Sequence, residues 1–424
     1  MEEAYLHFVW QHGLFEPGLL RTTCGIPVIL QNRGTYNLNS GPDFLHARIQ
    51  LDEKEWAGHV EIHIVASDWN RHGHQRDAAY NSTVLHVVHT ADEDVYRKDG
   101  TRVPCLEIGS RLFKGTETRY TQLMGGMENI PCAYGQPGNM QPEAKQMMHR
   151  ALSERLLKKA GVMTEKLKLL KGDWDELFYR QMARYMGMKV NADALETLAE
   201  RLPLRLLLRH TDKPAEVHAL LFGAAGMLHA GMKDAYSRDM FKTWRFLQHK
   251  YYLQPLNPEQ WKFMRMHPGN FPTIRIAQLA EIVLKGGRFG LLADFHSAAA
   301  WKNWLNVSAP DYWHSHYRFG VPSPQRFKRV GKDTADVLLI NAIAPLLFAY
   351  GDYTHEDGWK ERAIDLLSSL PAENNRITRQ WQKLGFENQT ASDSQAILGL
   401  QQLYCSAKRC LDCTIGQKLL AKVQ

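Results

Sequence analysis

Short stretches of alternating apolar and polar residues fill the first 115 residues of the chain. Runs of this kind, separated by Gly, Pro and Asn, are typical of β-strands joined by turns. Helix-like stretches at residues 2–15 and around residues 68–81 stand among them. The order helix, strands, helix, strands predicts a sheet domain with helical inserts. The strand-like runs are IPVILQN, FLHARIQL, GHVEIHIV, TVLHVVHT and TRVPCLEIG.

The pattern changes after residue 115. Residues 116–140 are rich in Gly, Pro and polar residues, which predicts a linker. From residue 141 onward, apolar positions return every three or four residues, and Pro142 suits the first turn of a helix. The sequence therefore predicts an α+β fold. An N-terminal mixed β-sheet domain with flanking helices occupies residues 1–115, and a large, mostly helical region with a C-terminal cysteine cluster occupies residues 141–424.

Composition and charge narrow the class of protein. The chain is 44% hydrophobic and 23% charged, and no apolar run approaches the roughly 20 residues of a membrane span. The N-terminus is acidic before it is apolar, unlike a secretory signal, so we expect a cytoplasmic protein without a membrane partner. Residues 1–115 hold 11 Lys and Arg against 15 Asp and Glu, whereas the remainder carries a net charge of +11. This asymmetry is compatible with nucleic acid, DNA or RNA, as a partner.

The run GHVEIHIV carries the first candidate site. Side chains alternate along a strand, so His59, Glu61 and His63 share one face. Asp43 stands at the entry of the preceding strand, and a short connection predicts that the two strands are antiparallel neighbours. Two adjacent carboxylates repel each other unless a cation lies between them, and oxygen ligands suit Mg²⁺ or Mn²⁺. The alternative interpretation is an ordinary solvated sheet face on which Glu and His alternate.

Histidines are concentrated around this run. Six of the 19 histidines fall between residues 59 and 89, and His72, His74 and Asp77 follow the strand after a few residues. Neutral imidazole is a common metal ligand and general base. This density favours a site over a solvated surface.

Residues 35–90 resemble the core of the PD-(D/E)xK nuclease superfamily. The resemblance lies in a Pro-Asp at a strand start, a hairpin, and Glu-x-His where Glu-x-Lys is common. It implies a restriction-endonuclease-like mixed sheet flanked by helices, with Asp43 and Glu61 holding magnesium for phosphodiester hydrolysis and His63 in the place of the lysine. The segment DWNRHGHQRD is similar to one in very-short-patch-repair-type relatives, which implies catalytic roles for His72, His74 and Asp77.

Across most of its length the chain also resembles an uncharacterised bacterial family of unknown function. The motifs are NSGPDFLHARI, GHVEIH with SDWNRHGH, NFPTIRIAQLA and YCSAKRCLDCTIG. This second resemblance implies no activity.

Three functional hypotheses follow. The first is metal-dependent phosphodiester hydrolysis, in which His63 or His72 accepts a proton from water. Because histidine lacks the permanent charge of lysine at pH 7, the second is an inactive nucleic-acid-binding or scaffold protein with a degenerate nuclease core. The third is a metal-dependent hydrolase of a small substrate that uses the histidine cluster.

The C-terminal cysteines form a second candidate metal site. Cys405, Cys410 and Cys413 are spaced as Cys-x4-Cys-x2-Cys, and Cys132 is a candidate fourth ligand. Such a set suits Zn²⁺ or an iron–sulfur cluster. The alternative is reduced cysteines packed in a terminal helix.

Basic residues near two loops are candidates for contact with nucleic acid. Both groups have the charge to contact phosphates, although solvated basic surface explains them equally well. A phosphate-binding loop at VGKDT is excluded because Arg326 stands where its glycine is required. The candidate residues are Arg265, Arg275, Arg326, Lys328 and Arg329.

Overall fold

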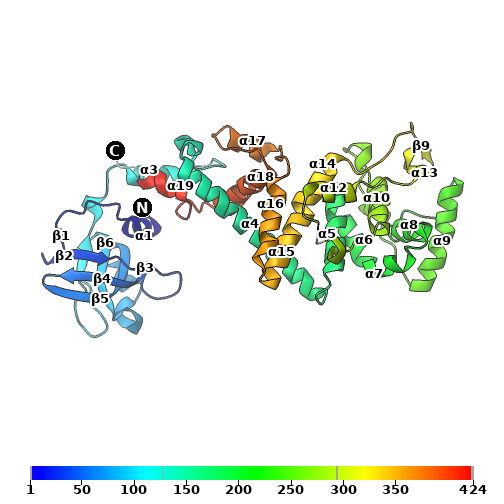
Figure 1. Ribbon diagram of the computed structural model, residues 1–424. Helices are drawn as coiled ribbons and strands as arrows, with labels where there is room; N and C mark the ends of the chain where they lie inside the picture. The colour runs from blue at the N-terminus through cyan, green and yellow to red at the C-terminus, as the bar shows by residue number, and fades with distance from the viewer. Residues whose placement is uncertain (1, 127, 293–294, 422–424) are drawn as a thin grey trace. The chain divides into compact units, whose positions relative to one another are not determined.

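The computed structural model describes residues 2–126, 128–292 and 295–421. The chain forms two compact units. The first contains residues 1–147, 384–386 and 401–424, and the second contains residues 148–383 and 387–400. Helix accounts for 54% and strand for 13% of the residues, and the strands of the larger sheet lie in the N-terminal part, so the α+β class is confirmed (Figure 1).

A mixed sheet forms the centre of the first unit. Its strand order is β1-β2-β4-β5-β6-β7, with β3 paired to the start of β4. Neighbours from β1 to β5 are antiparallel, whereas β6 is parallel to β5 and β7 is parallel to β6. The strands are β1 (Leu20–Arg21), β2 (Pro27–Asn32), β3 (Thr35–Tyr36), β4 (Phe44–Leu51), β5 (Lys54–Val65), β6 (Thr83–Thr90) and β7 (Cys105–Glu107).

Helices precede the sheet and cross between its parallel strands. Helix α1 (Glu3–His12) forms where the sequence predicts a helix, and it packs against β5. The crossover from β5 to β6 contains the short helix α2 (Asp68–Arg71) and the 3-10 turns η1 (His74–Arg76) and η2 (Ala78–Tyr80). The crossover follows directly after β5, and its His72 and His74 lie close to that strand.

Irregularities in the sheet position the side chains around Asp43. The β4–β5 hairpin turns at residues 52–53. Strand β5 therefore begins at Lys54, before the run GHVEIHIV. His46 has a φ of 60°, and the β4–β5 register shifts between Phe44 and Ala47. Such a bulge re-aims the side chains on either side of it.

The boundary of the first unit differs from the predicted one. The segment expected to be a linker, 116–140, contains helix α3 (Thr116–Gly125) and belongs to the first unit. Residues 401–424 also belong to this unit, and their helix α19 (Thr414–Ala421) packs against α3 (Figure 1). The sequence gives no periodic signal for this return, because it depends on contacts between segments about 290 residues apart along the chain.

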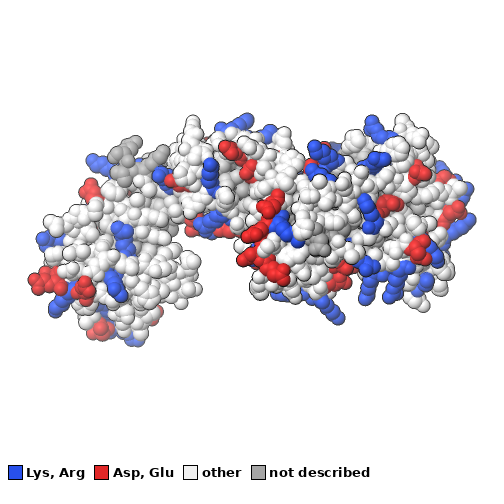
Figure 2. Space-filling model, in the orientation of Figure 1, with Lys and Arg blue, Asp and Glu red and all other residues white. Residues whose placement is uncertain are grey.

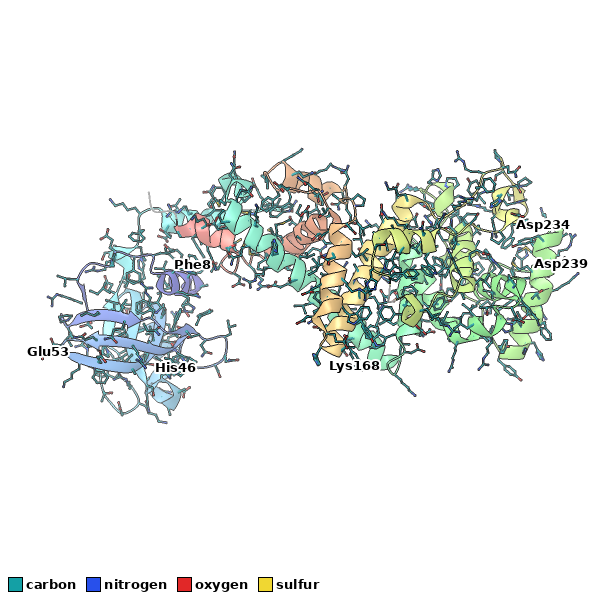
Figure 3. All side chains as sticks on the ribbon, viewed as in Figure 1. Phe8, His46, Glu53, Lys168, Asp234 and Asp239 are labelled. Carbon is teal, nitrogen blue, oxygen red and sulfur yellow. The ribbon has the colours of Figure 1, made fainter. Side chains whose placement is uncertain are left out.

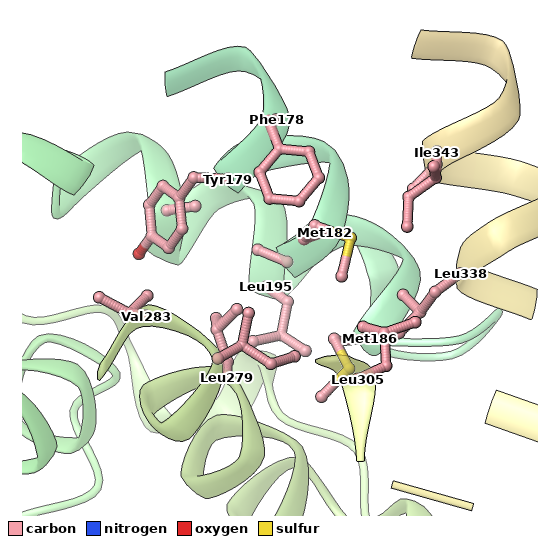
Figure 4. Close-up of a cluster of buried hydrophobic side chains, with 14 of the residues drawn as sticks. Phe178, Tyr179, Met182, Met186, Leu195, Leu279, Val283, Leu305, Leu338 and Ile343 are labelled. Atoms are coloured by element: carbon pink, nitrogen blue, oxygen red, sulfur yellow. The ribbon is translucent and has the colours of Figure 1, made fainter. Parts of the chain in front are cut away.

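The second unit is helical, as predicted, and has one large apolar core. Helix α5 contributes Phe178, Met182 and Met186 to this core, where α6, α10 and α14 pack against it (Figure 4). Helix α4 (Gln141–Leu169) begins in the first unit and continues in the second. The remaining helices are α5 (Trp174–Met186), α6 (Ala192–Arg201), α7 (Leu204–Leu207), α8 (Pro214–Ala224), α9 (Ala235–Tyr251), α10 (Pro272–Leu284), α11 (Phe289–Leu292), α12 (Ala298–Leu305), α13 (Asp311–His314), α14 (Lys332–Leu338), α15 (Ala344–Thr354), α16 (Asp357–Ser368), α17 (Arg376–Gln382) and α18 (Ala391–Leu400), with a small hairpin of β8 (His316–Arg318) and β9 (Val321–Pro322).

One continuous helix, Lys332–Thr354, is long and apolar enough to meet the criteria for a membrane span. Of its most apolar stretch, 83% is buried inside the protein, as in the core helix of a soluble domain. A π-turn at Leu339–Ile343 precedes Pro345. Proline has no N–H to donate to the preceding turn, which accounts for a local change of helical hydrogen bonding at this point.

The backbones of β5 and β6 lie close together at Gly58, so we expect the stability of the fold to be sensitive to substitution of this residue. A Cβ atom there would lie 2.3 Å from the Ser82 carbonyl oxygen and 2.4 Å from Val84 Cγ1. We expect Gly58→Ala to lower the free energy of unfolding by about 1–3 kcal/mol, because the backbone of β5 and β6 must separate. Gly125→Ala is the control, since a Cβ atom there meets open space, and it should be close to neutral. Chemical denaturation measures both, and equal effects would contradict this account.

Candidate functional site

Two hydrogen bonds tie Asp43 to the segment of β5 that carries Glu61. The Asp43 carboxylate Oδ2 accepts from the Ile62 backbone N–H at 2.9 Å. The Asp43 backbone N–H donates to Glu61 Oε2 at 3.1 Å. The antiparallel pairing of β4 with β5 sets both contacts, as the short connection between them predicts. The two acidic residues are therefore held together at the start of β4.

Three histidines converge beside Glu61. His63 Nε2 lies 3.1 Å from His72 Nδ1. Glu61 Oε1 lies 3.1 Å from His74 Nε2 and 3.6 Å from His63 Nε2. One ring nitrogen from each histidine lies within 4.8 Å of the others, which is close enough for all three to bind one cation. The predicted neighbourhood of His63, His72 and His74 thus has the geometry of a ligand set.

A fourth histidine supports this group from β6. His86 Nε2 lies 2.8 Å from His63 Nδ1, because His86 stands opposite Glu61 in the β5–β6 ladder. Burial lowers the pKa of His63 to about 2 and that of His86 to about 3, so both rings are neutral. If Nδ1 of His63 carries the proton and donates to His86, the lone pair on Nε2 faces His72 and His74. Metal-binding histidines usually have such a partner on the second nitrogen.

A second group of ligand atoms lies on α1. Glu3, His7 and Asp43 place three ligand atoms within 4.8 Å of one another. His7 Nε2 is 3.3 Å from Asp43 Oδ2 and 3.7 Å from Glu3 Oε1. Burial lowers the pKa of His7, but the neighbouring carboxylates together raise it above its ordinary value. The α1 helix therefore adds a histidine and a carboxylate to the acidic side of the site.

The electrostatics of the site favour a cation. Burial and then the charge of Asp43 raise the pKa of Glu61 far above the ordinary value, and burial raises that of Glu3. His74 Nε2 and His7 Nε2 are buried beside carboxylate oxygens yet lie outside hydrogen-bond geometry. A cation bound between these nitrogens and oxygens would satisfy both groups. The residues present fit a metal, and their nitrogen content suits a transition metal.

Aromatic residues cover this face of the sheet. Tyr80 stacks on His74 with ring centroids 3.8 Å apart, and Trp69 lies edge-on to the same ring at 5.4 Å. Val60 and Ile62 are fully buried on the opposite face, while Glu61 and His63 are buried as well. Glu61 and His63 share one face of β5, as expected, but aromatic side chains cover this face, so it is not solvated. His72 is the exposed member of the three histidines.

Other residues of the predicted site lie outside the two ligand groups. Asp77 is exposed, and its carboxylate accepts a hydrogen bond from the Ala79 N–H at 2.9 Å, so it caps a 3-10 turn. His59 contacts His46 instead, whose backbone N–H donates to His59 Nδ1 at 3.3 Å. Neither residue is placed to share a cation with Glu61.

The predicted basic contacts divide into buried and exposed residues. Arg275 is 3% exposed and donates to Asn270, Gln278 and Thr334, which are neutral. Lys328 is 5% exposed and donates to two backbone carbonyls. Both cationic groups make internal hydrogen bonds, and Arg275 also lines a cavity with Arg329, so contact with phosphate stays a prediction for these residues. Arg265, Arg326 and Arg329 are exposed.

The exposed basic residues do not gather into one track on the visible face. There, Lys and Arg are scattered among Asp and Glu over both units (Figure 2). Arg329, together with His267 and Lys332, lines a cavity of about 530 Å³ in the second unit.

The chain was compared with models of protein families. The family described as "Protein of unknown function (DUF2851)" matches residues 3–376. The chain belongs to the DUF2851 family. The predicted membership of a family of unknown function is confirmed, and the matched part contains both ligand groups of the sheet but ends before Cys405. Neither the curated proteins nor the solved structures give a match.

Three residues of this DUF2851 site were not predicted from the sequence. His86 interrupts the apolar run TVLHVVHT, and a histidine inside a buried strand is a usable signal. Glu3 and His7 stand four residues apart on a predicted helix, but their approach to Asp43 depends on how α1 packs. A pattern within one element does not contain that information.

The neutral buried histidines predict acid sensitivity of the metal-free protein. In the unfolded chain His86 takes up a proton below about pH 6.5, whereas in the folded chain its pKa is about 3. Between these values the unfolded state binds more protons, so stability falls as pH decreases. We expect His86→Phe to reduce the change in the free energy of unfolding with pH by about 1.4 kcal/mol per pH unit. Hydrogen exchange of β6 amides in EDTA between pH 4.5 and 7 measures it.

His89→Phe is the matched control for this prediction. His89 lies on the same strand, is less buried, and contacts Thr90. The acid sensitivity would not come from the buried pair if the pH dependence of stability were unchanged in the His86 variant. An equal change in the His89 variant would contradict the assignment as well.

Proposed function

We propose that this DUF2851 protein hydrolyses phosphodiester bonds of nucleic acid with a divalent metal bound at Asp43, Glu61 and the neighbouring histidines. The observation that carries the proposal is the contact between Asp43, at the start of β4, and Glu61, on the adjacent β5. The mixed sheet behind them, with α1 on one side and a helical crossover into a parallel strand, agrees with the architecture that the nuclease resemblance implies.

The ligand set favours Mn²⁺ or another transition metal over Mg²⁺. Three imidazole nitrogens face one point, and Mg²⁺ prefers oxygen ligands in near-octahedral geometry. Glu61 has one carboxylate oxygen toward the histidines and the other toward Asp43. It is therefore the residue that links the histidine group to the Glu3–His7–Asp43 group. A bound cation at this place supplies Lewis acidity and lowers the pKa of a coordinated water.

His63 does not replace the charge of a lysine. Its pKa of about 2 keeps it neutral, and both of its ring nitrogens face other histidines. Its role in this proposal is that of a ligand oriented by His86. His72 is exposed, so it is the ligand of the histidine group that solvent and substrate can reach.

The missing positive charge also supports a second candidate function. A nuclease-like core without a positive charge at the lysine position can bind nucleic acid without cleaving it, which is the scaffold hypothesis. A metal-dependent hydrolase of a smaller substrate would use the same ligands. Assays that separate binding from cleavage distinguish these functions.

The first test is nuclease activity of a Glu61 variant. We expect cleavage of labelled single- or double-stranded DNA or RNA with Mn²⁺, abolished by EDTA and reduced about 100-fold or more by Glu61→Gln. Glutamine has the shape of the protonated acid, so the fold should survive. Glu53→Gln is the control, because Glu53 is exposed in the β4–β5 turn, at the opposite end of the sheet from His46 (Figure 3).

Two outcomes of this assay contradict the proposal. Equal cleavage by the Glu61 variant and the native protein would assign the activity to a contaminant or to another site. Retained binding of nucleic acid without cleavage, across Mg²⁺, Mn²⁺, Zn²⁺ and Fe²⁺, would leave the scaffold function.

The second test is metal affinity of a His72 variant. We expect His72→Ala to weaken Mn²⁺ binding roughly 10- to 100-fold, because one of three converging imidazoles is removed. His89→Ala, in the same part of the fold, should leave the affinity unchanged. Isothermal titration calorimetry of EDTA-treated protein measures both. Equal affinities for the native protein and the His72 variant would exclude the histidine group as the metal site.

A further inference from the structure

Four cysteines from distant parts of the chain line one small cavity in the first unit. Cys132 comes from the loop after α3, and Cys405, Cys410 and Cys413 come from the C-terminal segment. All four are buried, and all are in the thiol form. The rest of the lining consists of Leu123, Pro131, Tyr404 and Gly416, so no carboxylate or imidazole joins them there. This convergence is not explained by the packing of a single terminal helix.

The backbone around the cavity is shaped to bring these thiols together. Lys408 has a φ of 51°, in the left-handed region, and the Arg409 N–H donates to the Tyr404 carbonyl at 2.9 Å. A Cβ atom at Gly416 would lie 2.1 Å from the Cys410 carbonyl oxygen. Only glycine allows helix α19 to start so close to the turn that carries Cys410 and Cys413.

Hydrogen bonds fix the two segments to each other on either side of the cavity. Gln401 Nε2 donates to the Asn129 carbonyl at 2.8 Å. Lys408 Nζ donates to the Met124 carbonyl at 2.9 Å, and Thr414 Oγ1 donates to the Glu143 carbonyl at 3.0 Å. The four thiols are therefore held in a defined arrangement from both sides.

The spacing of the thiols distinguishes between metals. A tetrahedral zinc site with Zn–S bonds of about 2.3 Å brings its sulfurs to roughly 3.8 Å from one another. Within the described part of the chain, the groups with three ligand atoms all inside 4.8 Å are His63–His72–His74 and Glu3–His7–Asp43, and the cysteines form no such group. A four-iron cluster carries its cysteines on separate irons, so its sulfurs stand farther apart, at roughly 6 Å.

We propose that Cys132, Cys405, Cys410 and Cys413 bind a [4Fe–4S] cluster. The convergence of four cysteines on one apolar cavity, without three sulfurs as close together as a zinc site requires, carries this assignment. The cluster joins the C-terminal segment to the loop after α3, and α3 in turn contacts α1 through the Tyr5 and Tyr120 rings, 4.8 Å apart. Its role is structural, and the inference does not depend on the proposed nuclease function.

The test is the composition of protein purified without oxygen. We expect about four iron and four inorganic sulfide per chain, with a brown colour that dithionite bleaches. Cys410→Ala should lose the colour and most of the iron. Cys24→Ala, at an exposed cysteine, and Cys105→Ala, at a buried cysteine of β7, should keep both.

If the Cys410 variant fails to fold, the iron and sulfide content of the native protein tests the assignment by itself. One zinc per chain without sulfide would overturn the cluster in favour of a zinc site. Metal-free protein that takes up no cluster when ferrous iron and sulfide are supplied would overturn it in favour of packed thiols.

Discussion

The pair of hydrogen bonds between Asp43 and β5 is the constraint on which the site depends. Asp43 Oδ2 accepts from the Ile62 N–H, and the Asp43 N–H donates to Glu61. The first contact fixes a carboxylate against the neighbouring strand, and the second fixes the carboxylate that faces the histidines. A buried Glu61 beside the half-buried Asp43 is unfavourable as an anion unless it is protonated or bound to a cation. The ligands on α1 and on the crossover surround this pair, so its charge determines what the site can bind.

Two histidines beside this acidic pair are neutral because they are buried. His63 and His86 lie in the interior of the sheet, where burial disfavours the charged ring. Neutral rings have lone pairs to offer, and the carboxylates supply the negative charge that a divalent cation requires. The site therefore combines carboxylate oxygens with several neutral nitrogen ligands rather than with a fixed positive charge.

Strand alternation was enough to group Asp43, Glu61 and His63, because the β4–β5 hairpin is local in sequence. It could not show that aromatic residues cover the polar face, nor that His7 approaches Asp43, because both depend on the packing of separate elements. Cysteine chemistry, without any periodic signal, predicts Cys132 as a partner of Cys405, Cys410 and Cys413, and all four line one cavity. The same residues were assigned to the wrong part of the fold, because their return to the first unit is a long-range contact.

The central claim is that a divalent cation binds between Asp43, Glu61 and the histidines. Anomalous diffraction from a crystal soaked in Mn²⁺, recorded at the manganese edge, tests it most directly. The account predicts an anomalous peak roughly 2 Å from Nε2 of His63 and His74 and from Glu61 Oε1. A manganese-soaked crystal with no peak at these atoms, and with Glu61 still hydrogen-bonded to Asp43 as a protonated acid, would contradict it.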